Sequence, residues 1–366
     1  MTRLRKMLLL YLIAILALVL TYLLIYRRTT LDFKNIPYLK TSLDHSSKPS
    51  RIDVSITVVA CGSKLEETLT MLKSALIYNT IKTFLNIKII TEDVLKQKFE
   101  SQLIKWQKDF PNHFSFELYS LQFPKTGEKD WRNLFKPCAA QRLFLPSLLR
   151  NTDATLYVDT DIVFLSSVED IWSHFNNFNA SQIAGLSPEH EDTQIGWYNR
   201  FARHPFYGPL GVNSGVMLMN LTRMRLFDWE NQILPLYKKY RSQITWGDQD
   251  LINILFFYHP DKLYIFPCIF NYRPDHCMYV NVCNITEGIR ILHGNRGYFH
   301  LSKQPIFKKI YETIRDLNVT IQQNYNNSLS HFPYQLNYSL VTSLANSSMC
   351  FKIINKIGKQ HIPALT

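Results

Sequence analysis

The sequence of 366 residues contains little glycine, little cysteine and no internal repeat. Twelve glycines exclude a collagen-like fibre, and six cysteines spread over this length exclude a small disulfide scaffold. A hydrophobic content of 46% excludes a disordered chain, and the lack of a repeat argues against a solenoid. The length and the apolar content therefore predict one large α/β domain or two small ones with a well-filled core.

Acidic side chains are also scarce, because 29 Asp and Glu stand against 41 Lys and Arg, for a net charge of +12. Such an excess can mark a nucleic-acid binder, but here it is concentrated at the two ends of the chain. Residues 1–51 carry +7 and residues 317–366 carry +3, which leaves the body between them at +2. We therefore expect no nucleic-acid partner.

Charge is absent altogether from residues 7–26, which read MLLLYLIAILALVLTYLLIY. A helix of this length spans about 30 Å, the thickness of the hydrocarbon layer of a membrane. A cleaved signal peptide is the alternative, but its apolar run would be shorter and would end at small residues. We therefore predict a cytosolic tail at residues 1–6, a transmembrane anchor at residues 7–26 and a polar stem at residues 27–51.

Glycosylation sequons and cysteines bear on which side of the membrane the body lies. The sequons begin at Asn179, Asn220, Asn284, Asn318, Asn326, Asn337 and Asn346, and chance explains several of those in the tail. All six cysteines follow the predicted anchor. Cys277 and Cys283 are close enough to pair in an oxidising lumen, whereas Cys61 and Cys268 also suit buried thiols. We expect a single-pass type II protein of the endoplasmic reticulum or Golgi membrane with a luminal body.

Apolar runs alternate with amphipathic stretches after the stem. The pattern predicts strands at 52–60, 87–90, 114–118 and 154–165, and helices at 65–77, 95–106 and 140–149. Strands that alternate with helices form a sheet with parallel strands, which binds ligands beyond the carboxyl ends of its strands. We place this domain at residues 52–316 and a polar tail at residues 317–366.

Two aspartates, Asp159 and Asp161, interrupt the apolar run of residues 154–165. Carboxylates at the end of a buried strand are costly without a compensating charge, and at this spacing both can converge on one divalent cation. A second pair, Asp248 and Asp250, precedes an apolar periodic run and also suits the first turn of a helix. We therefore predict a metal site at the first pair.

Three basic residues are candidates for the rest of such a site. His293 ends an apolar run, and an imidazole beside two carboxylates shifts the preference from Mg²⁺ toward Mn²⁺, although a structural role is the alternative. Arg142 and Lys303 are candidates for phosphate contacts, or else ordinary surface cations. The predicted metal ligands are thus Asp159, Asp161 and His293.

Two enzyme classes place an Asp-x-Asp pair at the end of a strand. In a nucleotide-sugar transferase, a cation bridges the acids and a diphosphate leaving group. In a haloacid-dehalogenase-type phosphatase, the first aspartate attacks phosphorus. This class also needs a further acidic pair, and we do not find one at a strand end. The transferase is favoured, and a luminal sugar-binding module without activity is a third hypothesis.

Four segments, in this order and spacing, resemble glycosyltransferase family 8. They are Asp159-Thr160-Asp161, residues 211–220 (GVNSGVMLMN), residues 246–250 (WGDQD) and His293-Gly294. Within the family, residues 196–205 (GWYNRFARHP) and 293–297 (HGNRG) are most similar to the glucoside xylosyltransferases. The resemblance covers roughly residues 55–316. It departs from glycogenin-like members after the histidine, where Lys303-Gln304-Pro305 replaces an earlier Lys-Pro-Trp.

The resemblance implies a Rossmann-like nucleotide-sugar-binding fold of the GT-A type, with a single mixed, mostly parallel sheet flanked by helices. It implies a retaining, Mn²⁺-dependent transferase that moves xylose from UDP-xylose to glucose. That glucose would be O-linked to EGF-like repeats, such as those of Notch receptors, and the new linkage would be alpha-1,3. Another family 8 transferase with a glucosyl or galactosyl donor is the alternative.

The resemblance also implies roles for individual residues. The donor and the metal are expected to contact Ala60, Cys61, Gly62, Arg142, Asp159, Thr160, Asp161, Asn213, Ser214, Gly215, Asp248, Gln249, His293, Gly294 and Lys303. Asp248, Gln249 and Arg142 are the expected catalytic residues. Because an amide is a poor nucleophile, Gln249 favours front-face attack over double displacement. The aromatic residues between 197 and 207 would contact the acceptor or else form a packed loop.

Overall fold

The computed structural model describes residues 19–21, 51–80, 82–125, 128–132, 134, 138–278, 282–318 and 350. The chain divides into two units, residues 1–50 and 51–366, and the second contains all the described strands. None of the helices among the described residues has both the length and the apolar character that a membrane span requires. Apart from residues 19–21, which are helical, the predicted anchor lies outside the described residues. The same holds for most of the predicted stem and polar tail.

The second unit alternates strands and helices along most of its length. Its strands are β1 (Ile52–Ala60), β2 (Thr83–Thr91), β3 (Phe114–Ser120), β4 (Ala154–Val158), β5 (Ile162–Phe164), β6 (Ala184–Pro188), β7 (Val212–Asn220), β8 (Leu263–Ile265) and β9 (Ile291–His293). Its α-helices are α2 (Leu65–Ile77), α3 (Asp93–Asp109), α4 (Glu128–Arg132), α5 (Leu145–Leu148), α6 (Val168–Trp172), α7 (Trp197–Phe201), α8 (Leu221–Leu226), α9 (Trp229–Tyr240), α10 (Asp248–Tyr258), α11 (Asp275–Met278) and α12 (Pro305–Asp316).

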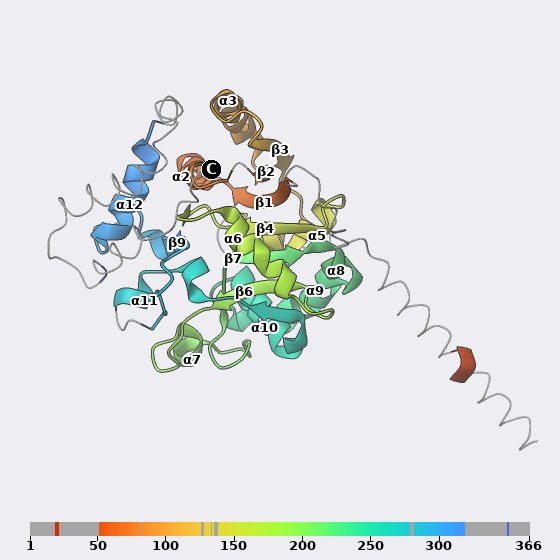
Figure 1. Ribbon diagram of the computed structural model, residues 1–366. Coiled ribbons are helices and arrows are strands. Elements are labelled where there is room, and N and C mark those ends of the chain that lie inside the picture. Colours follow the sequence, from red (N-terminus) through yellow and green to blue (C-terminus); the bar gives the residue numbers. More distant parts are fainter. Residues whose placement is uncertain are drawn as a thin grey trace, which may run out of the picture. The chain divides into compact units, whose positions relative to one another are not determined.

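Seven strands form one mixed sheet in the order β3-β2-β1-β4-β7-β6-β8 (Figure 1). The pairs β3–β2, β2–β1, β1–β4 and β6–β8 are parallel, whereas β7 runs antiparallel to both β4 and β6. The mixed, mostly parallel sheet expected from the sequence is therefore confirmed. Strands β5 and β9 lie outside it and pair antiparallel in a second, two-stranded sheet.

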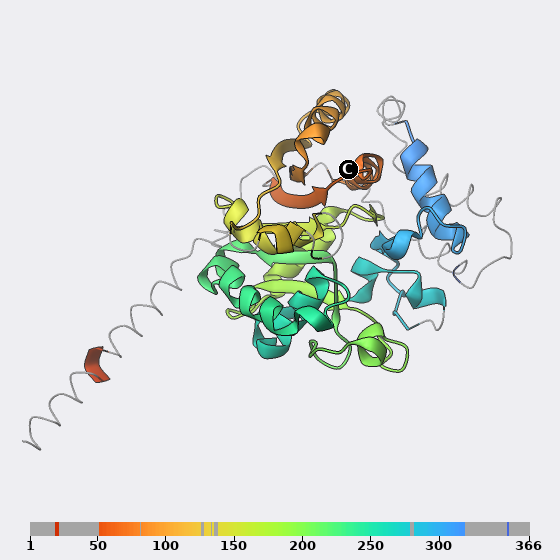
Figure 2. The ribbon, with the colours of Figure 1, turned by 180° about the vertical axis from the view of Figure 1, so that it is seen from behind.

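Two apolar clusters cover the two faces of the large sheet, because successive strand residues point to opposite sides. Leu156 and Val158 of β4 pack in one cluster with α2, α3 and α12, whereas Tyr157 between them packs in the other with α9 and α10. Figures 1 and 2 both show α12 beside α2, where Lys73 donates a hydrogen bond of 2.6 Å to the Arg315 carbonyl. Helix α12 is thereby held against α2.

The helix expected over residues 140–149 differs from the structure. Residues Ala139–Phe144 form a 3₁₀-helix, and only Leu145–Leu148 are α-helical. Pro146 explains the break, because it lacks the N–H that would continue the hydrogen-bond ladder and suits only the first turn of a helix. The strand predicted over residues 154–165 is likewise divided into β4 and β5 by the two aspartates.

All six cysteines form disulfides, and the pairing differs from the expectation. The bonds are Cys61–Cys138, Cys268–Cys283 and Cys277–Cys350. The expected link between Cys277 and Cys283 is therefore wrong, as is the alternative of buried thiols at Cys61 and Cys268. Separation in the sequence favoured the nearest partners, but the fold brings residues 73 and 77 positions apart into contact.

Candidate active site

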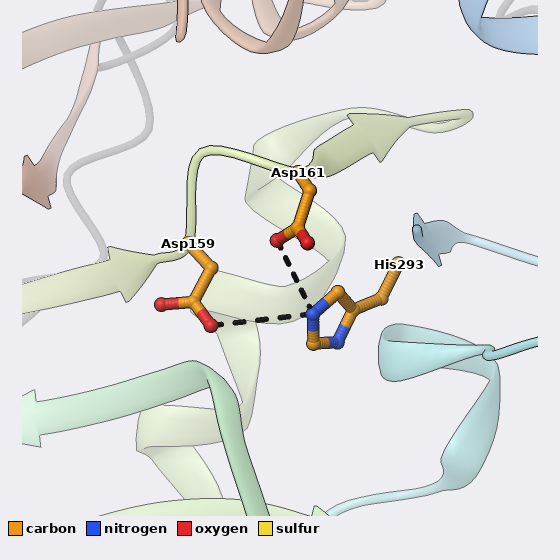
Figure 3. A group of neighbouring side chains, drawn as sticks. All are labelled: Asp159, Asp161 and His293. Atoms are coloured by element: carbon orange, nitrogen blue, oxygen red, sulfur yellow. Dashed lines mark ion pairs between the residues drawn. The ribbon is translucent and has the colours of Figure 1, made fainter. Parts of the chain in front are cut away.

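The carboxyl end of β4 carries the central cluster of acids. Asp159 and Asp161 flank the short connection between β4 and β5, and the antiparallel pairing of β5 with β9 places His293 opposite Ile162. Backbone bonds hold the connection on both sides, since Asp159 N–H donates to the Gly215 carbonyl and Gly294 N–H donates to the Asp161 carbonyl, each at 2.8 Å. Figure 3 shows the imidazole of His293 pointing toward both carboxylates. The structure thus brings together the three residues predicted to bind a metal.

The geometry of this cluster suits a divalent cation. His293 Nε2 lies 3.4 Å from Asp161 Oδ1 and 4.0 Å from Asp159 Oδ2, and one candidate ligand atom from each residue lies within 4.8 Å of the others. Asp159 and Asp161 are partly exposed, whereas His293 is buried. Two carboxylate oxygens with one imidazole nitrogen form a donor set that accommodates Mn²⁺.

A chain of hydrogen bonds fixes which nitrogen of His293 faces the acids. Gly215 N–H donates to Asn213 Oδ1, which therefore accepts a second bond from Asn271 Nδ2 at 2.9 Å. The oxygen of Asn271 then lies 2.8 Å from His293 Nδ1, which must carry the proton. His293 Nε2 therefore faces the two carboxylates, and in the neutral imidazole it would offer a lone pair to a cation bound between them. The sequence pointed to Asn213 but gave no signal for Asn271.

Two glycines permit the close approach of these elements. A Cβ on Gly215 would lie 2.2 Å from His293 Cε1, and a Cβ on Gly294 would lie 2.4 Å from the ring of Phe299. Both positions were predicted to contact the donor. The structure gives both a packing reason, because any larger residue would displace His293 or the turn that follows it.

Arg142 lies behind the acids with its side chain almost fully buried. Its guanidinium donates to Asp159 Oδ1 at 2.9 Å and to the Ser214 carbonyl at 2.6 Å, and it pairs with Asp248. Burial alone would lower the pKa of Arg142, but the carboxylates of Asp159 and Asp248 raise it above the ordinary value. These partners engage the guanidinium, so the structure places Arg142 as the charge that holds the acids together.

The second Asp-x-Asp pair starts α10, as the helical interpretation predicted, yet both side chains are buried. Burial raises the pKa of Asp248 to about 6, although its partner Arg142 acts in the opposite direction. Asp250 accepts bonds of 2.7 Å from the backbone N–H groups of Thr245 and Trp246. Asp248 thus belongs to the charged cluster at the site, and Asp250 holds the turn that precedes the helix.

Gln249 lies between these two acids and is partly exposed. Its Oε1 accepts from the backbone N–H of Ser214 at 3.1 Å and from Ser214 Oγ at 3.3 Å. Its Nε2 donates to the hydroxyl of Tyr198 at 3.2 Å. Tyr198 is buried, whereas Phe201, three residues later, is 52% exposed. The aromatic segment therefore includes both a packed residue and a residue open to an acceptor.

The turn after β1 lies at the same end of the sheet. The Ala60 carbonyl accepts from Thr91 Oγ1 at 2.7 Å, and Cys61 is bonded to Cys138. Gly62 has a φ of +61°, which favours glycine, and its N–H donates to Glu92 at 2.7 Å. This turn therefore lies beyond the carboxyl end of a parallel strand, the position at which such sheets bind ligands.

A further carboxylate at the site was missed in the sequence. Glu67 of α2 is buried and accepts a hydrogen bond from Thr160, between the two predicted metal ligands. It also accepts from Lys64 Nζ and His300 Nε2, each at 2.7 Å, and both of these side chains are nearly half exposed. Lys303, the predicted phosphate contact, lies on an exposed turn before α12. Two basic side chains are therefore held beside Thr160 by a residue that no motif indicated.

Comparison with known proteins gives consistent relatives. Residues 48–296 match the family Glycosyl transferase family 8. Glucoside xylosyltransferase 2 of Mus musculus is 51% identical over 305 residues, which cover 80% of this chain and 68% of that protein. Glucoside xylosyltransferase 1 of Mus musculus is 52% identical over 289 residues, which cover 75% of this chain and 70% of that protein.

Solved structures share the fold at low sequence identity. The galactosyltransferase LgtC, in complex with donor and acceptor sugar analogs, has a TM-score of 0.57 and 15% identity, and the match covers 72% of this chain and 95% of that chain. The apo form of mouse xyloside xylosyltransferase 1 has a TM-score of 0.50 and 16% identity, with 67% and 98% covered. At these identities the likeness concerns the fold alone.

Proposed function

The chain belongs to glycosyl transferase family 8, and from that premise we propose that it transfers xylose from UDP-xylose to glucose. The observation that carries the proposal is the identity of about 50% to two glucoside xylosyltransferases over three quarters of the chain or more. A donor set of Asp159, Asp161 and His293 at the strand ends supports it. In the finer form of the proposal, the glucose is O-linked to EGF-like repeats such as those of Notch, and the linkage is alpha-1,3.

The proposed mechanism distributes charge around a leaving diphosphate. Asp159, Asp161 and His293 would hold Mn²⁺, which when bound supplies positive charge to a nucleotide diphosphate. Arg142 holds Asp159 in place from behind, so that the carboxylate keeps one orientation. Preorganised charge of this kind is usually the largest single contribution to catalysis. In a front-face reaction, the departing phosphate oxygen takes the proton of the acceptor hydroxyl, and no protein nucleophile is required.

The test is a transfer assay with a panel of UDP-sugars and a glucosylated EGF-like repeat, with Mn²⁺ or with a chelator. We expect xylose transfer that needs the metal, and a loss of about 10²–10³ in rate for Asp161→Ala. Asp170→Ala, which changes an acid paired with Arg290 away from the cluster, is the matched control. If only UDP-glucose supported transfer, the proposed donor UDP-xylose would be wrong. Phosphate release from small phosphoesters without a nucleotide sugar would refute the transferase.

A second part of the proposal concerns location, namely a luminal body on a single membrane anchor. Among the sequons whose three residues are all described, Asn179 and Asn284 are exposed, whereas Asn220 caps α8 through a bond of 2.9 Å from Arg223 N–H. We expect glycans at the first two positions of the full-length protein expressed in animal cells. Treatment with an N-glycosidase should increase its electrophoretic mobility. A mobility that does not change would contradict the luminal orientation.

A further inference from the structure

The side-chain amide of Gln249 is oriented by groups whose hydrogen-bonding roles are fixed. Ser214 N–H can only donate, so the atom of Gln249 that lies 3.1 Å from it must be the oxygen. Ser214 Oγ accepts from Arg142 at 3.0 Å and so turns its own proton toward the same oxygen. Both lone pairs of the Gln249 carbonyl oxygen are therefore occupied by Ser214, and its nitrogen faces Tyr198.

The hydroxyl of Tyr198 is oriented in the same way. Val212 N–H donates to Asn253 Oδ1 at 2.8 Å, which directs Asn253 Nδ2 to the Tyr198 hydroxyl at 2.9 Å. Because this hydroxyl also accepts from Gln249 Nε2, its proton goes to Asp250 Oδ1 at 2.9 Å. The Tyr198 hydroxyl is thus fully bonded, and it anchors the nitrogen of Gln249 to the buried start of α10.

One hydrogen-bonding group of Gln249 remains after these contacts. An amide has two N–H groups and one oxygen, and only one N–H is taken, by Tyr198. Among the described residues, no acceptor takes the second N–H. Gln249 is partly exposed, and its partner Ser214 also accepts from Arg142, which pairs with Asp159. The amide therefore presents a donor to the site, while its oxygen is turned away.

Resting on the proposed transfer reaction, we propose that Tyr198 is a positioning residue that makes Gln249 a hydrogen-bond donor to an oxygen of the bound sugar. In this arrangement the carbonyl oxygen of Gln249 does not face the anomeric carbon. The same packing explains Gly211, since a Cβ there would lie 2.3 Å from the Tyr198 ring. The segment 197–201 thus acts on the donor through Gln249, whatever the acceptor is.

The first test is a double-mutant cycle on the full-length protein in the transfer assay. We expect Tyr198→Phe to lower kcat about tenfold, a change of about 1.4 kcal/mol, with little change in the KM for the nucleotide sugar, because the amide of Gln249 loses the hydroxyl that anchors it. On a Gln249→Ala background, Tyr198→Phe should change kcat by less than twofold. If the reductions in kcat caused by the two single substitutions multiplied in the double variant, the two residues would act independently and the proposal would be wrong. Tyr240→Phe, which removes a hydroxyl bonded to Tyr258 at the far end of α10, should behave like the wild type.

Gln249→Glu tests the role of the N–H separately. A carboxylate keeps an oxygen for Ser214 but has no N–H, so we expect kcat as low as in Gln249→Ala. Activity near that of the wild type would show that an oxygen serves at this position, contrary to the proposal.

A crystal structure of Tyr198→Phe gives a readout that does not depend on activity. We expect the Gln249 side chain to leave Ser214 or to occupy more than one rotamer. If Gln249 kept its wild-type position, Tyr198 would not position it and the proposal would be wrong. This readout does not depend on which sugar the enzyme uses. A wild type that transfers no sugar would instead refute the proposed function.

Discussion

At the scale of single residues, the site depends on buried charges that compensate one another. Arg142 forms ion pairs with both Asp159 and Asp248. Glu67 accepts hydrogen bonds from Thr160, Lys64 and His300. Removing Arg142 would leave the buried carboxylate of Asp248 without a counter-charge, which costs about 3–5 kcal/mol. A second buried group, His276 in α11, is paired with Glu191 and lies beside Arg273.

His276 provides a pH-dependent prediction. Burial lowers its pKa from 6.5 to about 4, and the groups facing it are Glu191, Arg273, His190 and Tyr272. Below pH 6.5 the unfolded chain takes up a proton that the folded chain does not, so stability falls as the pH drops from about 6.5 to 4. The full effect is at most about 3 kcal/mol.

The measurement is the free energy of unfolding in urea at pH 7.5 and pH 4.5. His276→Gln should reduce the loss of stability at the lower pH. The control His113→Gln changes a partly exposed histidine in the turn between α3 and β3 and should leave the pH dependence unchanged. The prediction would be contradicted if the wild type and His276→Gln lost the same free energy of unfolding between pH 7.5 and pH 4.5.

At the scale of elements, β7 organises the site, since Asn213, Ser214 and Gly215 each bond to a different partner. Strand β7 runs antiparallel to β4, so its first residues lie beside the carboxyl end where the acids are. One side of the strand faces Asn271 and His293, and Ser214 faces Arg142 and Gln249. A change at these first residues of β7 should therefore affect the metal site more than the fold.

Gly215→Ala should weaken Mn²⁺ binding by about tenfold or more, because the added Cβ displaces His293 from the carboxylates. The melting temperature should change by only a few degrees. Titration of the purified protein with Mn²⁺, followed by electron paramagnetic resonance, measures the affinity. The control Gly208→Ala adds a Cβ in open space at a φ of +53° and should leave the affinity unchanged. Unaltered binding in Gly215→Ala would refute this role.

Local patterns predicted the strands up to β4 and the helices α2 and α3, whereas most later elements and the long-range relations were not predicted. The strand at 52–60 and the helix at 65–77 have the predicted bounds, because apolar periodicity depends only on neighbours in the sequence. The acids and His293 were predictable from a strand-end position and from a resemblance. Asn271 and Glu67 were not, because their partners are set by the packing of segments 22 to more than 90 residues apart.

At the scale of the whole molecule, disulfides join segments that are distant in the chain. Cys61–Cys138 links the turn after β1 to the segment that carries Arg142, and Cys277–Cys350 attaches residue 350 to α11. Closing a long loop removes more entropy from the unfolded chain than closing a short one. The bonds therefore differ in the stability that they provide.

The loop closed by Cys61–Cys138 spans 77 residues, and the loop closed by Cys268–Cys283 spans 15. Replacing both cysteines by serine should cost about 4.5 kcal/mol for the first bond and about 3 kcal/mol for the second. Urea unfolding of the two double variants without reductant measures the difference. A larger loss for the shorter loop would contradict this ranking.

The sharing of one guanidinium by Asp159 and Asp248 has a consequence for how this sequence can diverge. Losing the arginine leaves two carboxylates together without a counter-charge, whereas neutralising either acid leaves the arginine paired with the other one. The effect of replacing one of the three residues thus depends on which of the other two are present. The three positions should therefore drift as one unit, and deep mutational scanning should find strong epistasis among them.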